Sequence, residues 1–339
     1  MIPQIALLGA AFGAMLLTAL LGVVMVPLLQ KLTNLYPTKN AGPAWHARKQ
    51  GIPTMGGIML IFSAILAAIV FSSMVVAAVP EISQVSWQQS GKTTTVTLLF
   101  ALANGALGLT NDILKLRSKN GKGIPLFAML LAQLVFTAFF MAALQSDGML
   151  STVVQLPGIG LVDLKFSFYP LSYFLILAVI NGVNATDGVD GLAVSVTFLV
   201  LLALLSVASL LGWYHIALFS AAVTGACAGF LCWNFPPAKI FMGDTGSLFL
   251  GGAVAGIAFS IGHPELLLLL GLVYFVELLS MLVQIVYCKA RKGKCLFKTT
   301  PLHHHLELCG WSEVKITGWF SGAALVCVAT SLVFAYMYY

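Results

Sequence analysis

Long apolar runs that carry almost no charge restrict this sequence more than any other feature. A run of about 20 such residues can cross roughly 30 Å of hydrocarbon as one helix. Lipid also excludes open sheets, because every backbone polar group there needs a partner within the protein. With 60% hydrophobic and 8% charged residues, the chain cannot be a water-soluble globular protein. The ten runs cover approximately residues 3–29, 56–79, 93–110, 125–145, 167–185, 192–212, 215–233, 245–262, 266–287 and 316–338.

These runs predict an all-α integral membrane protein with about ten transmembrane helices. Because no soluble domain, low-complexity segment or short-period repeat interrupts them, we expect a single polytopic transmembrane domain, residues 1–339. The first run has no basic residue ahead of it, so it lacks the basic region of a signal peptide and is expected to stay as a span.

The basic residues are distributed unevenly over the connections between the runs. Fifteen of the 17 lysines and arginines fall in odd-numbered connections, and only Lys92 and Lys165 fall in even-numbered ones. The positive-inside rule places the more basic connections in the cytoplasm. We therefore expect both termini outside and a polar cleft on the cytoplasmic face. The odd-numbered connections are residues 30–55, 111–124, 186–191, 234–244 and 288–315.

One run and one connection carry local irregularities. The run 266–287 contains Glu277, which we interpret as a buried structural partner. This run is long enough to be kinked or to extend past the bilayer. The connection 146–166 allows a small hairpin around Pro157 and Gly158.

The six cysteines predict no disulfide. They lie in or near the apolar runs and show no C-x-x-C spacing. Free, buried thiols are therefore expected. Their positions are 227, 232, 288, 295, 309 and 327.

The stretch 234–252 places a carboxylate where a polar connection becomes an apolar run. Asp244 stands between Gly243 and Gly246, and the amides that follow it open a helix. A lone acid at such a boundary is costly unless a cation compensates it, and a helix start binds anions. The pattern therefore indicates a divalent ion that bridges protein and phosphate. An N-cap before an apolar helix explains the same residues without any ligand.

Two further connections place acids beside helix ends. Residues 181–191 read N-G-V-N-A-T-D-G-V-D-G, with Asp187 and Asp190 each followed by glycine, and they do not complete a calcium loop. A functional role explains these amides and acids better than a structural one. Asp112 lies three positions before Lys115, which allows either a simple ion pair or a metal or phosphate site.

Three consecutive histidines, His303, His304 and His305, lie in the last odd-numbered connection. Neighbouring side chains on a helix point about 100° apart, and no H-E-x-x-H spacing accompanies them, so a zinc site is not indicated. Contact with phosphate, or orientation of a substrate, fits them better. In the first connection, Lys49 and Thr54 offer a cation and a hydroxyl, for which phosphate contact and lipid-headgroup contact are equally good explanations.

Four motifs carry a resemblance that covers nearly the whole chain in order. They are H-x-x-K-x-G-x-P-T-M-G-G at 46–57, V-N-x-T-D-G-x-D-G-L-A at 183–193, N-x-x-P-A-K-x-F-M-G-D-T-G-S at 234–247 and P-L-H-H-H-x-E at 301–307. In these motifs the sequence resembles the polyprenyl-phosphate N-acetylhexosamine-1-phosphate transferase superfamily. The last motif resembles the branch that transfers phospho-N-acetylmuramoyl-pentapeptide.

The resemblance implies ten spans around a cleft at the inner face of a bacterial cytoplasmic (inner) membrane. It also implies Mg²⁺-dependent transfer of phospho-N-acetylmuramoyl-pentapeptide from its UDP carrier to undecaprenyl phosphate, which yields lipid I and UMP for peptidoglycan synthesis. A homodimer is compatible with it. The catalytic residues so implied are Asp112, Asp187, Asp244 and His303, with Asp244 as the Mg²⁺ ligand. The substrate-binding residues so implied are Lys49, Thr54, Asn184, Gly188, Asp190, Asn234, Phe241, Gln284, His304 and His305, with Phe241 stacked on uracil.

The chain departs from the family pattern at Asn111. The family usually has two consecutive aspartates where this chain has Asn111 and Asp112, and a lysine-bearing G-L-x-A-K-x-K where it has residues 123–129. Asn111 cannot accept a proton. A phosphate monoester has a second pKa near 6 and is largely ionised at neutral pH. Direct attack on the β-phosphorus without a dedicated base therefore tolerates Asn111.

The sequence alone leaves two other functions open. A related transferase of N-acetylglucosamine 1-phosphate would differ only in its donor. A secondary transporter of an anionic substrate would place ionisable groups near the midplane of the bilayer, often with repeat symmetry. Here only Glu277 lies about halfway along its run. The depth of the ionisable residues discriminates between enzyme and transporter.

Overall fold

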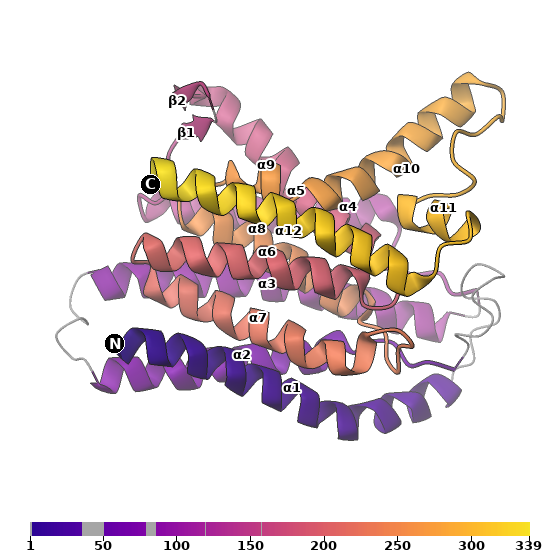
Figure 1. Ribbon diagram of the computed structural model, residues 1–339, viewed down its shortest axis with the longest axis horizontal. Helices are drawn as coiled ribbons and strands as arrows, with labels where there is room; N and C mark the ends of the chain where they lie inside the picture. The colour runs from indigo at the N-terminus through magenta and orange to yellow at the C-terminus, as the bar shows by residue number, and fades with distance from the viewer. Residues whose placement is uncertain (1, 36–50, 79–85, 119, 157) are drawn as a thin grey trace.

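The computed structural model describes residues 2–35, 51–78, 86–118, 120–156 and 158–339. In these residues the regular structure is almost entirely helical, and the long helices run side by side along the longest dimension of the molecule (Figure 1). The helices are α1 Ile2–Leu35, α2 Gly57–Ala78, α3 Ser86–Arg117, α4 Leu126–Ser146, α5 Phe168–Thr186, α6 Leu192–Leu210, α7 Tyr214–Asn234, α8 Gly243–Ser260, α9 Leu266–Leu270, α10 Leu272–Ala290, α11 Leu302–Leu308 and α12 Glu313–Tyr338.

Nine of the described helices are long and apolar enough to cross a membrane, which confirms an all-α integral membrane protein. Among the ten expected runs the exception is α8, because Asp244, its serines and its glycines lower its hydropathy. Every residue of α8 from Thr245 to Ser260 is nevertheless buried. A helix that other helices shield from lipid does not need a fully apolar surface. The composition of α8 therefore fits its place at the centre of the bundle.

Glycines allow α2 and α3 to approach the start of α8 closely. A Cβ atom added to Gly57 of α2 would lie 2.3 Å from the backbone nitrogen of Gly246. One added to Gly108 of α3 would lie 2.1 Å from the backbone oxygen of Asp244. Small residues at helix contacts are the usual means of close packing in membrane proteins. The first turn of α8 is therefore held between two neighbouring backbones.

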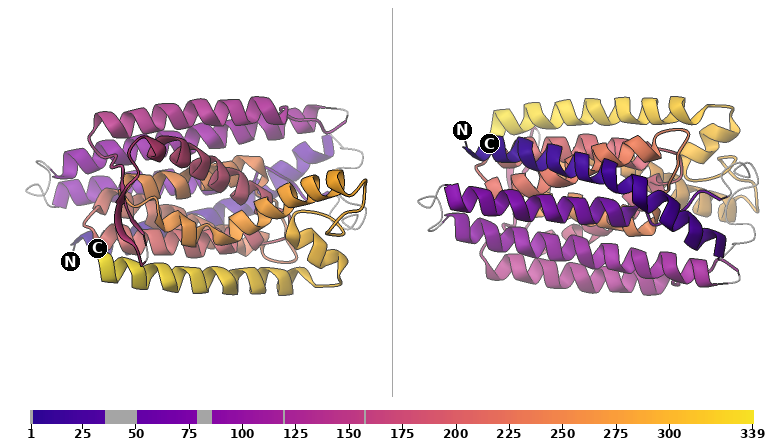
Figure 2. Two further views of the ribbon diagram at one scale, coloured as in Figure 1. Left: turned by 90° about the horizontal axis from the view of Figure 1, so that it is seen from above. Right: turned by 90° about the horizontal axis from the view of Figure 1, so that it is seen from below.

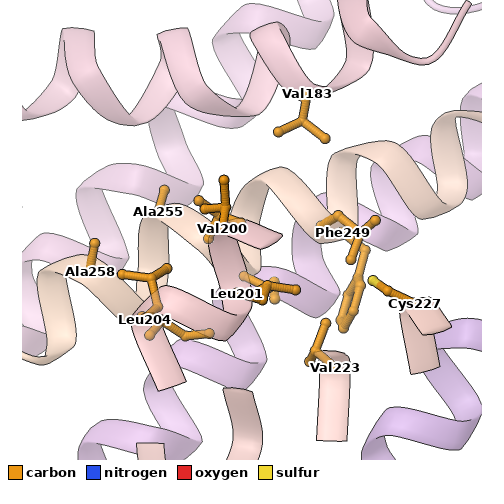
Figure 3. Close-up of a cluster of buried hydrophobic side chains, with 14 of the residues drawn as sticks. Val183, Val200, Leu201, Leu204, Val223, Cys227, Phe249, Ala255 and Ala258 are labelled. Carbon is orange, nitrogen blue, oxygen red and sulfur yellow. The ribbon is translucent and has the colours of Figure 1, made fainter. Parts of the chain in front are cut away.

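The apolar core surrounds the body of α8. Phe249 of α8 lies beside Val223 and Cys227 of α7, and Val200 and Leu201 of α6 belong to the same cluster (Figure 3). All five side chains are fully buried. Because interiors of this kind are close-packed, they resist displacement of any one helix. The polar first turn of α8 thus projects from a rigid support.

The ninth expected run is interrupted at Gly271, which separates α9 from α10 and confirms the expected kink. Beyond this point α10 leaves the bundle at an angle (Figure 1). Its buried residues, Val273, Tyr274, Glu277 and Ser280, all lie in its first half. The side chain of Glu277 is fully buried, as expected for a structural partner.

Both chain termini lie at one end of the bundle, and α11 lies at the other end (Figures 1 and 2). The described parts of the odd-numbered, basic connections gather at the α11 end. The assignment of this end to the cytoplasm stays a prediction of the positive-inside rule.

A small hairpin precedes α5, as the sequence predicts. Strands β1 (Val153–Leu156) and β2 (Gly160–Asp163) pair antiparallel, with Val153 opposite Asp163. A short 3-10 helix, η3 (Lys165–Ser167), then leads into α5. Of the predicted turn, Gly158 is described with a positive φ of 73°, whereas Pro157 lies outside the described residues.

The expectation that all cysteines are free is wrong for two of them, because Cys288 and Cys295 form a disulfide. After α10 ends, the chain turns back at Gly293, whose amide donates to the carbonyl oxygen of Cys288 (2.8 Å). This turn brings the two Cα atoms to 4.7 Å, a separation that a disulfide can bridge. The four free cysteines are Cys227, which is buried, Cys327, which is partly buried, and Cys232 and Cys309, which are exposed.

Candidate active site

Asp112, near the end of α3, binds the first turn of α8. Asp112 is 4% exposed, and its Oδ2 accepts hydrogen bonds from the amide (2.9 Å) and hydroxyl (2.7 Å) of Thr245. Its Oδ1 accepts from the amide of Asp244 (3.2 Å). Asp112 thus supplies the anion that a helix start favours. The amide of Thr245, which the sequence offered as part of an anion site, is already bonded within the protein.

Asp244 lies at the centre of a hydrogen-bond network between three helices. Its Oδ2 accepts from Asn111 Nδ2 and from Lys115 Nζ, each at 2.5 Å. Its Oδ1 accepts from Asn184 Nδ2 (2.9 Å), which also donates to Ser247 Oγ (2.8 Å). Lys115 therefore pairs with Asp244, and not with its neighbour Asp112 as a simple ion pair would require. The network joins α3, α5 and α8 at the α11 end of the bundle.

Asp187 follows α5 directly and lies among other acids. Burial and three nearby carboxylates raise its pKa to about 8, while the ammonium group of Lys115 opposes this shift. The carboxylates are those of Asp244, Asp112 and Asp190. A carboxyl with such a pKa is mostly protonated at neutral pH. The site is therefore short of positive charge, and an added cation would favour ionisation of Asp187.

Helix α11 places His303 against the turn that follows α5. A Cβ atom added to Gly188 would lie 2.1 Å from His303 Nε2, so only a glycine permits this approach. The imidazole is fully buried, and its Nδ1 lies 3.2 Å from Oε2 of the equally buried Glu277. The same oxygen accepts from the backbone amide of His303 (3.4 Å). Glu277 thus connects α10 to α11.

The other two histidines of α11 turn to different partners. His304 Nδ1 lies 2.5 Å from Glu307 Oε2, and the rings of His303 and His304 stand edge to face at 4.2 Å. His305 Nδ1 accepts from the amide of Lys298 (3.1 Å). The three rings therefore do not converge on one point, as their adjacency in a helix predicts.

Thr54 borders the site from the segment that leads into α2. A Cβ atom added to Gly243 would lie 2.8 Å from Thr54 Oγ1. This segment is fixed by the amide of Phe241, which donates to the carbonyl oxygen of Pro53 (2.8 Å). The phenyl ring of Phe241 is partly exposed, as stacking on a base would require. Lys49, which the resemblance implies as substrate-binding, lies outside the described residues.

Three of the predicted substrate-binding residues also hold the connections in place. Asp190 Oδ2 accepts from the amide of Ala238 (2.8 Å). Asn234 accepts a hydrogen bond from the amide of Gly191, which precedes α6, and donates one to the carbonyl oxygen of Ile240, which follows α7. Gln284 exchanges hydrogen bonds with the backbone of Phe297. Their contact with a nucleotide stays a prediction, whereas their structural role is direct.

Two residues at the centre of the network are absent from the catalytic and substrate-binding residues that the sequence predicts. Asn111 and Lys115 are four positions apart, so they share one face of α3, and both contact Asp244. That spacing was the available signal. Sequence spacing cannot reveal which other helix this face meets, and so it paired Lys115 with Asp112.

The donor set at this site suits Mg²⁺. Among the described residues, no three His, Cys, Asp or Glu side chains form a ready chelating group. Mg²⁺ does not require one, because it is usually held by one or two carboxylates together with substrate phosphates and water. Asp244 and Asp187 offer carboxylate oxygens, and burial, followed by the neighbouring carboxylates, raises the pKa of Asp187, so a nearby cation would favour its ionised form. The residues present therefore fit this ion.

The ionisable groups around Asp244 lie at helix ends rather than halfway along the spans. Asp112 and Lys115 lie in the last two turns of α3, Asp187 follows α5 and Asp244 begins α8. Such a position at one end of the bundle is what an enzyme at the membrane surface requires. A transporter site at the bilayer midplane would need a different distribution.

Comparison with known proteins places this arrangement in a family. Residues 94–262 match the model of glycosyl transferase family 4. A phospho-N-acetylmuramoyl-pentapeptide-transferase of Halalkalibacterium halodurans is 37% identical over 93% of this chain and 94% of its own length. The transferases of the same name from Bacillus subtilis (37% identical) and Desulforudis audaxviator (36%) both cover 96% of this chain, and 97% and 96% of their own lengths. The chain therefore belongs to the phospho-N-acetylmuramoyl-pentapeptide-transferase family.

Proposed function

We propose that this protein transfers phospho-N-acetylmuramoyl-pentapeptide from its UDP carrier to undecaprenyl phosphate. The products are lipid I and UMP, and the reaction serves peptidoglycan synthesis at the inner face of a bacterial cytoplasmic membrane. The proposal rests on sequence identity of 36–37%, over 93–96% of the chain, to proteins named phospho-N-acetylmuramoyl-pentapeptide-transferase. The acids and amides around Asp244 support it, because such groups suit a diphosphate and its cation.

The reaction is a direct displacement at phosphorus. An oxygen of the lipid phosphate forms a bond to the β-phosphorus of the donor, and the bond from that phosphorus to the bridging oxygen breaks. UMP leaves with the bridging oxygen. The attacking phosphate is largely ionised at neutral pH, since its second pKa is near 6. The chain therefore needs no base at Asn111, whose amide group cannot accept a proton.

The main barrier is repulsion between two anionic substrates. Two unit charges 4 Å apart repel by about 4 kcal/mol at an effective dielectric of 20. Asp244 would hold Mg²⁺, which would supply positive charge that offsets this repulsion and stabilises the leaving phosphate. Asn184 and Asn111 hold the Asp244 carboxylate in place. Lys115, and His304 beside the buried His303, contribute donors for phosphate oxygens.

An apolar groove beside α11 suits the lipid acceptor. This groove, of about 300 Å³, opens between α10, α11 and α12. Its lining includes Leu302 and Leu306 of α11 and Trp319 of α12. Leu302 directly precedes His303, so the groove lies beside the helix that carries the histidines. A polyprenyl chain in this groove would place its phosphate near the α11 end.

The test is to incubate purified protein with both substrates and Mg²⁺ and to follow UMP release. We expect release only when donor, undecaprenyl phosphate and metal are all present, and loss of release on chelation. UDP-N-acetylglucosamine, offered in place of the muramoyl donor, serves as the control for donor identity. UMP release from that control donor alone would replace the proposed reaction with transfer of N-acetylglucosamine 1-phosphate.

A further inference from the structure

The protein's own donors already occupy the Asp244 carboxylate. Two of them, Asn111 Nδ2 and Lys115 Nζ, bond to one oxygen, and Asn184 Nδ2 bonds to the other. A carboxylate oxygen has about two lone-pair sites, so Oδ2 is fully used. A cation can bind this oxygen only after one donor leaves.

We propose that Lys115 is the resident counter-ion of Asp244 and that a divalent cation displaces it when the cation binds Oδ2. The exchange couples metal binding to arrival of the diphosphate donor, because the phosphates compensate the displaced ammonium group. This inference rests on the proposed function only in that it assigns the cation to Asp244. Lys115 is thus a positioning residue for the metal rather than its ligand.

Exposure identifies Lys115 as the donor that moves. Its side chain is 45% exposed, whereas that of Asp244 is 17% exposed. The long, flexible ammonium stem can therefore turn to a new partner without disturbing the bundle. Diphosphate oxygens bound near Asp244 would offer that partner, since an ammonium group binds phosphate as a point charge. Positive charge then stays in the site throughout the exchange.

Asn111 cannot move in the same way. It is 4% exposed, and its Oδ1 accepts from the backbone amide of Ile124 (2.6 Å). A Cβ atom added to Gly123 would lie 2.1 Å from the same oxygen, so the chain closes tightly over it. This contact fixes the amide so that its NH₂ group faces Asp244. Asn111 therefore presents a donor, without charge, where an aspartate would present a second carboxylate.

The identity of residue 111 consequently sets how strongly the site attracts a cation. A carboxylate at this position would face Asp244 Oδ2 at the present contact distance of 2.5 Å. Two carboxylates that close cannot both ionise unless a cation lies between them. Asn111 removes that demand, so in the metal-free site Lys115 is the cation that pairs with Asp244. Asn111→Asp should therefore strengthen metal binding because it adds a carboxylate. Lys115→Met should strengthen it because it removes the ammonium group that the metal displaces.

A Mn²⁺ titration of the purified full-length protein without substrates, followed by the electron paramagnetic resonance signal of the free ion, tests the exchange. We expect Lys115→Met to bind Mn²⁺ roughly tenfold more tightly than the parent, the factor that one charge-assisted hydrogen bond represents. Lys115→Arg, which keeps the charge, should show no such gain. Lys122→Met is the matched control, because exposed Lys122 carries the same charge at the same end of the bundle.

The coupling is measured by repeating the titration with UDP-N-acetylmuramoyl-pentapeptide and no lipid acceptor. Each titration with donor has a protein-free control, which accounts for Mn²⁺ bound to the free nucleotide. We expect the donor to tighten Mn²⁺ binding more in the parent than in Lys115→Met, because only the parent has an ammonium group to release. Equal tightening in both proteins would overturn the coupling.

Other outcomes decide the counter-ion assignment. Unchanged or weaker Mn²⁺ binding by Lys115→Met would overturn it. An equal gain in Lys122→Met would also overturn it, because the gain would then come from the lower net positive charge of the protein rather than from the contact with Asp244. Asn111→Asp provides the second variant: it should bind Mn²⁺ more tightly than the parent, and a failure to do so contradicts the account of residue 111. None of these titrations requires lipid I formation. A negative UMP assay with a positive metal titration would reject the proposed function and keep this inference.

Discussion

Two polar regions lie at the α11 end, and their buried groups are held very differently. Around Asp244, α3 and α5 supply donors to both carboxylate oxygens, and Asp112 bonds the helix start beside it. In the second region, around His303 and Glu277, His303 Nε2 and Glu277 Oε1 have no hydrogen-bond partner among the described residues, and His303 Nδ1 lies 3.2 Å from Glu277 Oε2 without the geometry of a hydrogen bond. The supports differ too, because α8 is buried along its body whereas α10 is buried only in its first half.

This contrast indicates which region is complete before substrate arrives. An unsatisfied buried polar group costs about 1–3 kcal/mol, so a fold retains several of them together only where something else offsets the cost. The Asp244 region is preorganised by the protein itself. The His303 region, beside the apolar groove, is the part that the lipid acceptor would complete.

Removal of the Asp244 carboxylate should have the largest effect. We expect Asp244→Ala to lower the rate of UMP release on the order of 10³-fold or more, because both the metal and the phosphate lose their anchor. Asp163→Ala is the control, since Asp163 lies in the hairpin and accepts from Thr152 (2.7 Å). Comparable rates of UMP release in the two variants would show that the Asp244 region takes no part in the reaction.

Loss of the helix-start contact should affect stability more than binding. Asp112→Ala leaves the Thr245 amide and hydroxyl without their acceptor, which should destabilise the protein by about 2 kcal/mol. Asp112→Asn keeps one acceptor oxygen and should lose less. Thermal unfolding in detergent measures both. Identical unfolding temperatures for the parent and Asp112→Ala would show that the α8 start does not depend on this residue.

Glu277 tests whether the second region depends on the carboxylate. We expect Glu277→Gln to lower the rate roughly tenfold, as expected for one hydrogen bond to a charged group. Glu277→Leu should in addition speed hydrogen exchange of the α11 amides, because the contact with the His303 amide is lost. If exchange in α11 matches the parent, the His303 region is held by other contacts.

Asp187 should give a smaller, pH-dependent effect. Its pKa is raised to about 8 in the folded protein, against about 3.9 in an unfolded chain. As pH rises from about 4 to about 8, the unfolded state releases the proton first, so the parent loses stability over this window. Asp187→Asn should remove this loss and therefore be more stable than the parent at pH 8.

The check is the unfolding temperature of parent and Asp187→Asn between pH 5 and pH 9. A difference that grows with pH is expected, and saturating Mg²⁺ should reduce it by favouring the ionised carboxylate. A constant difference would show that Asp187 does not titrate in this window.

The spans, the kink and the hairpin could be predicted because each depends on neighbours in sequence. A charge-free run predicts a helix, and the glycine turn after β1 predicts its hairpin. Burial of Glu277 followed from its place within an apolar run. The residues of the candidate site could be singled out because acids and amides at helix ends are rare in a chain with 8% charged residues.

The partners of those residues could not be predicted, because they depend on contacts between distant helices. Asp112 bonds the start of α8, and Lys115 bonds Asp244, across 132 and 129 positions. The bond between Cys288 and Cys295 depends on a turn at Gly293 that no cysteine spacing signals. Local sequence patterns therefore predicted the helices, the hairpin and the candidate residues. The contacts between those residues are determined by the packing of distant helices.

The most direct test is the mass of the lipid product formed from undecaprenyl phosphate and UDP-N-acetylmuramoyl-pentapeptide, by the parent and by Asp244→Ala in parallel. The account predicts a lipid that carries a diphosphate and the intact muramoyl-pentapeptide, from the parent alone. The same lipid formed at the same rate by Asp244→Ala, or no such lipid from the metal-supplied parent, would contradict it.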